Sequence, residues 1–585
     1  MFKGGDMQQR YWGPRYADGT WQICLWAPKA ERVRIMLDDS PQPMTQTDKG
    51  VWCADLQAAP GSCYRFDVDG VVMPDPASRL QAGGVDGASV LMLPDSHEWR
   101  CNWQGRPWSQ AVIYELHVGT FTPQGIYASA QDKLVQLAEM GFTAIQLMPV
   151  GQFAGQRGWG YDGVLPYAPH PVYGSPGDLK RLIDAAHDCG LMVYLDLVMN
   201  HFGPEGAFIH HSSPDFFDAS RKTPWGPAID FSRPAVQEFW IDCALHWLDE
   251  YRFDGLRLDA VHQIQGPGAD AFMTRLAEEV HALSPRRHLI TEDERNIPDL
   301  RQAGYDASWN DDFHHAVHVA LTGEDDSYYA SFADDPVGDL ATALARGHIE
   351  EGQPRPHLAT PRGAPCDHLP VTGFVNAVQT HDQVGNRAMG DRLVTLADPR
   401  AVAAAYALLL ISPYVPMVFM GEERGETAPF QFFADFDGDL AQAVRDGRAS
   451  EFAGIAALGQ SVPDPLSPAT FQRSKLSWNE DTSASAWIDL TRKALHFRAA
   501  HVMPLIASPR LGVEVTRPAP GLIRAEWRFA AGTLALSLAF GQPDPNPIPD
   551  ANFRAGHPNA DYALTARAIH HDAKHSDRHL SRATA

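Results

Sequence analysis

The stretch FDGLRLDAVH (253–262) predicts a short buried strand that ends in polar residues. It is one of eight such stretches between about residues 110 and 425, with amphipathic helices predicted between them. Since parallel strands need long crossover connections, usually helices, this alternation predicts an α/β fold, a (β/α)8 TIM barrel. The other seven strands are predicted at 111–119, 143–150, 191–201, 288–294, 305–311, 374–382 and 416–423.

Helix boundaries inside this region follow from proline and glycine. Ser175 and Pro176 favour the start of a helix that Gly190 ends, and Pro234 begins another. The twenty residues 401–420 carry no charge, but two prolines interrupt them. We therefore expect a buried helix (401–411) followed by a buried strand (415–420) rather than a membrane span.

Both ends of the chain have a strand pattern of their own. Short runs such as TWQICLWAP and ERVRIMLDD, separated by turn residues, predict an N-terminal Ig-like β-sandwich over 1–105. The barrel is expected over 106–505, with a Pro-, Phe- and His-rich loop subdomain near 202–233 at its mouth. A small C-terminal β domain is expected over 506–585.

The last residues of that domain are polar. We expect the tail from about Arg567 to be mobile, and its histidines to be solvated rather than metal ligands, because no cysteine or carboxylate cluster completes a site. These histidines are His570, His571, His575 and His579.

The composition sets limits on function. The 585 residues are 44% apolar and 21% charged, which excludes a disordered chain. A balance of 48 Lys+Arg against 72 Asp+Glu gives a net charge of −24, which opposes binding to nucleic acid or to a membrane surface. The seven cysteines are odd in number and include no CxxC pair, and the N-terminus has no apolar leader. We expect reduced thiols, no disulfide framework and a cytoplasmic protein.

Polar residues at the carboxyl ends of barrel strands are the candidates for chemistry. Arg257 and Asp259 are two apart on one strand, so their side chains share a face and the guanidinium keeps the carboxylate ionised, as a nucleophile must be. Glu292 ends the next strand with no basic neighbour in sequence; in an apolar pocket its pKa would rise and it could donate a proton. Two such carboxyls suit glycoside cleavage, retaining at about 5–5.5 Å separation and inverting at about 6.5–9.5 Å.

Four strand ends together resemble the conserved regions of the α-amylase superfamily: DLVMNH (196–201), GLRLDAVH (255–262), ITEDERN (290–296) and VQTHDQ (378–383). The resemblance implies that Asp259 is the nucleophile, Glu292 the acid/base, and Asp382 the residue that holds the sugar hydroxyls. It also implies that Arg257, His201 and His381 bind at the cleavage site. Tyr161 is expected to stack on the glucose ring, the structural alternative being a core aromatic.

Longer strings, such as YELHVGTFTPQG (114–125), HDQVGNRAMGDRL (381–393) and TFQRSKLSW (470–478), are similar to the maltooligosyltrehalose trehalohydrolase family. This implies hydrolysis of the α-1,4 bond next to the terminal trehalose of maltooligosyltrehalose. His262 is expected at the +1 subsite, and Gln383 and Arg387 are expected to bind substrate. Asp311, Asp312, His314 and His315 either line the subsites for trehalose or order the loop after the sixth strand. Two residues depart from the pattern beside the site, Thr380 in place of Asn and Arg424 in place of an aromatic.

Other functions share parts of this pattern. A glycogen branching or debranching enzyme would have the same acids, and a non-catalytic glycan-binding protein would not need them. A zinc hydrolase is not favoured, because no HExxH motif is present. Asn200 matches a residue that helps bind calcium in some amylases, but no Asp-rich calcium loop follows it. We expect no metal and no cofactor.

Overall fold

The computed structural model describes residues 11–47, 49–94, 97–453, 461–479 and 481–571. Its centre is a closed barrel of eight parallel strands, which confirms the predicted fold class. Each strand lies inside a predicted stretch or within one residue of it, and the order around the barrel is the order along the chain. The strands are β11 (Ile113–Leu116), β12 (Ala144–Leu147), β15 (Met192–Leu197), β18 (Gly255–Leu258), β19 (His288–Thr291), β20 (Ala307–Trp309), β21 (Phe374–Asn376) and β22 (Val415–Phe419).

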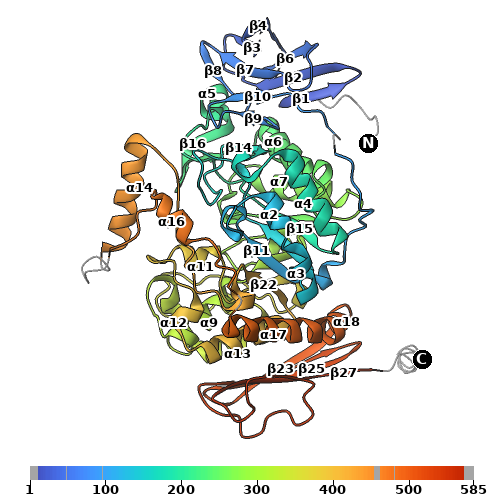
Figure 1. Cartoon of the computed structure of the whole chain (residues 1–585), viewed down its shortest axis with the longest axis vertical. Helices are drawn as coiled ribbons and strands as arrows, with labels where there is room; N and C mark the ends of the chain where they lie inside the picture. The colour runs from blue at the N-terminus through green and yellow to red at the C-terminus, as the bar shows by residue number, and fades with distance from the viewer. Residues whose placement is uncertain (1–10, 48, 95–96, 454–460, 480, 572–585) are drawn as a thin grey trace.

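Helices surround this barrel (Figure 1). Helix α4 (Pro176–Asp188) begins as predicted, with the Ser175 hydroxyl accepting a hydrogen bond from the Asp178 amide. The uncharged stretch near residue 410 forms the buried helix α13 (Pro399–Ile411) and then β22, also as predicted. The other described helices of seven or more residues are α3 (Leu134–Met140), α6 (Pro234–Leu245), α7 (Ala269–His281), α9 (Asp311–Thr322), α10 (Pro336–Arg346), α14 (Gly438–Glu451), which stands apart from the barrel in Figure 1, and α17 (Thr482–Phe497).

The sixth barrel strand is shorter than its predicted stretch. The strand ends at Trp309, and Asp311 is the first residue of helix α9 rather than the last residue of a strand. Which side chains face the barrel mouth after this strand therefore follows the turn of a helix, not the alternation of a strand.

The N-terminal region forms two antiparallel sheets, in the strand orders β1-β2-β6-β5 and β4-β3-β7-β10-β9, with β8 beside β7. Figure 1 shows them at one end of the molecule, beside the loop subdomain. Lys29 pairs with Asp215 at 2.5 Å, and the Ser213 hydroxyl donates to the Trp26 carbonyl, so this sandwich is joined to the loop subdomain. The strands are β1 (Gly13–Ala17), β2 (Thr20–Trp26), β3 (Val33–Leu37), β4 (Ser40–Pro43), β5 (Thr45–Gln46), β6 (Val51–Leu56), β7 (Cys63–Val68), β8 (Val71–Met73), β9 (Gln81–Ala82) and β10 (Ala88–Val90).

The expectation of seven reduced cysteines is wrong in this sandwich. Cys24 on β2 and Cys53 on β6 lie directly opposite each other in the antiparallel register, with Cα atoms 4.3 Å apart, and form a disulfide. This separation is at the short end of the range of about 4.4–6.8 Å that is usual for disulfides. Within the described chain the other five cysteines are free.

The predicted loop subdomain contains α5 (Ile209–Ser212) and a hairpin of β16 (Phe217–Thr223) and β17 (Gly226–Ile229). The C-terminal sheet has the order β23-β24-β25-β27-β26. Its strands are β23 (Arg510–Ala519), β24 (Leu522–Phe529), β25 (Gly532–Phe540), β26 (Phe553–Ala555) and β27 (Tyr562–His570). The predicted tail thus begins too early, since β27 pairs with β25 as far as His570. His575 and His579 lie outside the described residues.

The domain limits at 105 and 505 stay predictions. Among the residues that the structure describes, no helix has the length and apolar character needed to cross a bilayer.

Candidate active site

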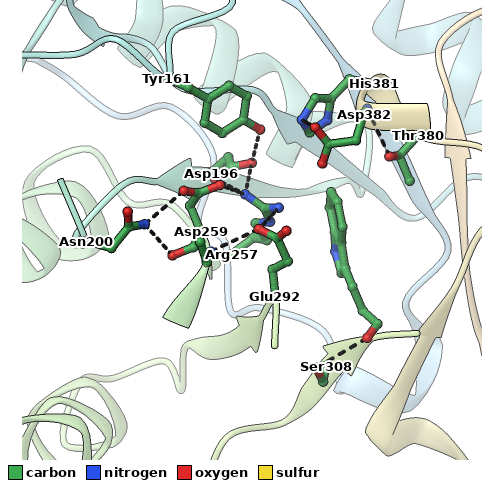
Figure 2. Close-up of polar contacts among 12 residues, drawn as sticks. Tyr161, Asp196, Asn200, Arg257, Asp259, Glu292, Ser308, Thr380, His381 and Asp382 are labelled. Atoms are coloured by element: carbon green, nitrogen blue, oxygen red, sulfur yellow. Dashed lines mark hydrogen bonds and ion pairs between the residues drawn. The ribbon is translucent and has the colours of Figure 1, made fainter. Parts of the chain in front are cut away.

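Three acids meet at the carboxyl ends of the barrel strands (Figure 2). Asp259 follows β18, Glu292 follows β19, and Asp382 lies in α11 (His381–Gly385), which begins shortly after β21. All strands of a parallel barrel end on the same rim, so residues far apart in sequence converge there.

Arg257 joins two of these three acids. Its side chain is fully buried; Nη1 donates to Asp259 and to both carboxylate oxygens of Asp196, each at 2.8 Å, and Nη2 donates to Glu292 at 2.6 Å. Its guanidinium also lies over the Trp309 ring, 4.1 Å from the centroid. One guanidinium therefore connects Asp259 and Glu292, which sets their two carboxyl groups close to each other.

Glu292 has surroundings that favour its protonated form. Burial raises the pKa of Glu292 well above its ordinary value; Arg257 opposes this shift, and the charges of Asp259 and Asp382 add to it. Its Oε2 also accepts a hydrogen bond from the Ala260 amide at 2.9 Å, and Ala260 adopts a left-handed φ of 41° that L-residues rarely populate. The pocket is thus not apolar, since Arg257 reaches Glu292 from the neighbouring strand.

Asp259 is fixed by an amide as well as by Arg257. Asn200, after β15, donates from Nδ2 to the Asp259 carbonyl at 2.8 Å and to its carboxylate at 2.9 Å. His201 bonds to the Tyr161 carbonyl through Nε2 at 2.9 Å, and its ring stacks on Trp225 at 4.1 Å. Asn200 thus forms direct hydrogen bonds with Asp259.

Tyr161 belongs to the site rather than to the core alone. Its hydroxyl donates to Asp196 at 2.7 Å, and its ring stacks on His381 with centroids 5.1 Å apart. Burial, with the charge of Asp196, raises the pKa of Tyr161 well above its ordinary value, so the hydroxyl remains a donor.

His381 and Asp382 form the third part of the site, after Asp259 and Glu292. Nε2 of His381 is 3.4 Å from Asp382 Oδ1, and Nδ1 is 2.7 Å from the buried carboxylate of Glu115. Burial alone would raise the pKa of Asp382, but the charge and hydrogen bond of His381 lower it below its ordinary value. Thr380 caps α11 by accepting from the Asp382 amide at 3.2 Å, so the departure from Asn keeps a capping residue.

Asp311 lies near Glu292 and Asp382, whereas Asp312 and His314 are not joined to the three acids. Partial burial raises the pKa of Asp311 to about 6, with Asp382 adding to the shift. Asp312 is fully buried and accepts from the Ile349 and Glu350 amides at 2.7 Å.

The histidines that follow on α9 are also buried. His314 bonds to the Val378 carbonyl and the Tyr329 hydroxyl, and His315 packs against Phe332. These contacts suit the second alternative for Asp312 and His314, in which they order the loop after the sixth strand, and their role stays a prediction.

The other residues expected to bind substrate lie at the rim. His262 follows Asp259 by three residues and pairs with the exposed Glu294 at 3.4 Å. Gln383 accepts two hydrogen bonds from Thr380, and Arg387 pairs with Glu324 at 2.7 Å. In this structure the amide oxygen of Gln383 and the two terminal nitrogens of Arg387 are used within the protein.

Arg424 is predicted to lie beside the site, and its described contacts are with other residues. It is buried between Glu423, which accepts from its Nε at 2.8 Å, and the ring of Trp478. None of the hydrogen bonds or ring contacts described for Arg424 involves the three acids.

Sequence reasoning did not assign Trp309 or Glu115. Trp309 ends the sixth strand without a recognisable signal. Glu115, in contrast, is a single charge inside the apolar run AVIYELHVG (111–119), which is a usable sign of a paired buried group. Among the described residues no group of three His, Cys, Asp or Glu could hold a metal ion.

The comparisons with known proteins agree with this geometry. The model of the alpha amylase catalytic domain matches residues 116–225, and that of carbohydrate-binding module 48, the isoamylase N-terminal domain, matches residues 12–76. A curated malto-oligosyltrehalose trehalohydrolase from Deinococcus radiodurans is 42% identical over 469 residues, which are 78% of this chain and 77% of that protein. The chain belongs to the malto-oligosyltrehalose trehalohydrolase family.

Other relatives agree with this membership. The trehalohydrolase of Saccharolobus solfataricus is 40% identical and shares 78% of this chain and 82% of its own length. Among solved structures, a protein from Salmonella typhimurium superposes with a TM-score of 0.92 at 45% identity, over 96% of this chain and all of the other. A pullulanase from Paenibacillus barengoltzii superposes with a TM-score of 0.71 at 20% identity, a likeness of fold alone. The trehalohydrolase family therefore combines, in this chain, an amylase barrel with a module 48 sandwich.

Proposed function

We propose that this chain is a retaining glycoside hydrolase that cleaves the α-1,4-glucosidic bond next to the terminal trehalose of maltooligosyltrehalose and releases trehalose. The substrate follows from the family of its relatives, which share about 40% of their residues with this chain. The observation that carries the chemistry is the shared guanidinium of Arg257, which holds Asp259 and Glu292 at one rim.

In the proposed first step, Glu292 protonates the glycosidic oxygen while Asp259 attacks the anomeric carbon. The raised pKa of Glu292 supplies the proton, and Arg257 and Asn200 hold the Asp259 carboxylate in place for attack. The C–O bond to the trehalose unit breaks, trehalose leaves, and a glycosyl ester forms on Asp259.

In the second step, Glu292 takes a proton from water, which attacks the anomeric carbon and displaces Asp259. Two inversions give overall retention, and two carboxyls bound by one guanidinium are compatible with the separation of about 5–5.5 Å that this route uses. We assign Asp382 to the sugar hydroxyls, with His381 beside it, and Tyr161 to contact with the sugar ring.

Incubation with purified maltooligosyltrehalose tests the proposal. The expected products are trehalose and a maltooligosaccharide, and Glu292→Gln should lose about 10²–10⁴-fold in activity. New α-1,6 branches without trehalose would indicate a branching enzyme; one such relative, from Bacillus caldolyticus, is 32% identical over half of this chain. Near-normal activity of Glu292→Gln on an unactivated oligosaccharide would contradict the assignment.

A further inference from the structure

Glu115 is a buried carboxylate that the proposed reaction does not use. It lies in the middle of strand β11, is fully buried, and faces the barrel interior. Its Oε1 accepts from His381 Nδ1 at 2.7 Å, and its Oε2 lies 3.2 Å from the His381 amide, which donates to it. A charge in a barrel core is costly unless it is paired, and both pairing contacts of Glu115 go to this single residue.

The remaining sides of the His381 ring are enclosed by aromatic residues. Tyr161 stacks on the ring at 5.1 Å, and the edges of Trp159 and Trp309 approach at 5.7 and 6.0 Å. The ring therefore has one orientation, in which Nδ1 faces Glu115 and Nε2 faces Asp382. An imidazole can donate to carboxylates on both sides only when both nitrogens carry a proton.

We propose that Glu115 is a positioning residue that holds His381 as an imidazolium, and that this cation fixes the charge and orientation of Asp382. The proposal rests on the proposed function in one respect, the assignment of Asp382 to the substrate hydroxyls. Glu115 itself touches neither the substrate nor the reacting atoms.

The charges around His381 support this arrangement. Burial lowers the pKa of His381, but Asp382 and Glu115 outweigh it and raise the pKa well above its ordinary value. Asp196, on β15, also interacts favourably with the His381 cation. His117, beside β11, does not compete, because burial lowers its pKa to about 3 and leaves it neutral.

The wild-type enzyme offers a direct test. In protein labelled with ¹⁵N-histidine, with the His381 resonances identified by their loss in His381→Asn, both ring nitrogens should be protonated at pH 8. A neutral ring at pH 8 would overturn the proposal. This experiment needs no folded variant of Glu115 and no substrate.

Variants test the effect on turnover. In Glu115→Gln the cation loses one of its two partners, so the pKa of His381 falls and the alkaline limb of kcat moves to lower pH. We expect kcat at pH 8 to fall about 10- to 100-fold with KM nearly unchanged. Glu115→Asp keeps the charge and should keep the alkaline limb nearer to its wild-type position.

Gln146→Met is the matched control. Gln146 is the register partner of Glu115 on β12, is equally buried, and its side-chain polar atoms have no hydrogen-bond partner within the described chain. The pH profile of Gln146→Met should match that of the wild-type enzyme. A lower kcat in Glu115→Gln with an unshifted alkaline limb, or an equal shift in Gln146→Met, would overturn the proposal.

The choice of substrate distinguishes a failure of the Glu115 proposal from a failure of the proposed function. An α-maltotriosyl fluoride carries a good leaving group and no trehalose unit, so it depends on Asp259 and Asp382 but little on acid assistance from Glu292. The pH profiles are measured on it as well as on maltooligosyltrehalose. If the fluoride is turned over but no trehalose is released, the proposed substrate fails and the Glu115 comparison still stands.

Discussion

The guanidinium of Arg257 lies over the indole of Trp309, with Cζ 4.1 Å from the ring centroid, and its two terminal nitrogens divide Asp259 and Glu292 between them. The ring of Trp309 fixes the plane of the Arg257 guanidinium, and the guanidinium in turn fixes both carboxyl groups. A lysine ammonium is a point charge on a flexible side chain and cannot fix two carboxyl groups in this way.

Arg257→Lys is therefore expected to lower kcat/KM by about 10²-fold or more, because an ammonium group cannot serve Asp196, Asp259 and Glu292 in one plane. Steady-state kinetics on maltooligosyltrehalose measures the effect. Thermal unfolding of the same variant serves as the control for folding. A folded Lys variant with kcat/KM within about threefold of wild type would contradict the role of the fork.

Asn200→Ala removes two hydrogen bonds from Asp259. We expect kcat to fall about tenfold or more, since hydrogen bonds to charged groups contribute about 1.5–3 kcal/mol. Asn200→Asp should be worse than Ala, because it places a second carboxylate against Asp259. The reverse order in single-turnover rates would show that Asn200 does not act on that carboxylate.

Asp312→Asn is expected to affect stability rather than binding. Its carboxylate accepts from the Ile349 and Glu350 amides and is paired with Arg362 at 3.4 Å. Loss of this buried charge should cost about 1–3 kcal/mol in the free energy of unfolding. Denaturant unfolding and KM are measured together. A raised KM with unchanged stability would return Asp312 to the substrate-binding residues.

Asp311→Asn is the matched substitution one residue earlier. The negative charge of Asp311 is one of those that raise the pKa of Glu292, after burial, Asp259 and Asp382. Neutralising it lowers the pKa of Glu292, so the proton donor is lost at lower pH and the alkaline limb of kcat/KM moves to lower pH. Asp312→Asn should leave that limb in place, and equal profiles for the two variants would count against the assignment.

The fold could be predicted because its determinants are local. Each barrel strand is a short apolar run between helices with proline or glycine at their ends, as at Pro234 and Gly190. The three acids could be predicted for a related reason, since the carboxyl ends of parallel strands share one rim.

The other contacts of the site could not be predicted, because they depend on the register of the strands and on the residue at which a helix begins. The contact of Arg257 with Glu292 arises across two neighbouring strands, where Arg257 is level with Ile290. The different positions of Asp311 and Asp312 follow from a helix that begins at Asp311, where a strand was predicted. Neither the strand register nor the first residue of that helix is specified by the composition of the segment.

The disulfide between Cys24 and Cys53 shows the same limit, because it depends on the pairing of two strands 29 residues apart. Titration of the denatured protein without reductant should find five free thiols, and seven after reduction. Reduction should destabilise the N-terminal sandwich by about 3–4 kcal/mol. Seven thiols before reduction would show that the bond is absent.

In the proposed mechanism, Asp259 forms a covalent bond to the sugar while Glu292 transfers the proton. Mass spectrometry of the enzyme treated with a 5-fluoro maltooligosyl fluoride tests it directly, with Asp259→Asn as the control. We expect one glycosyl adduct on the peptide that contains Asp259, formed by the wild type and absent from the control. An adduct on another residue, or an unmodified enzyme that turns the reagent over with inverted anomeric configuration, would contradict it.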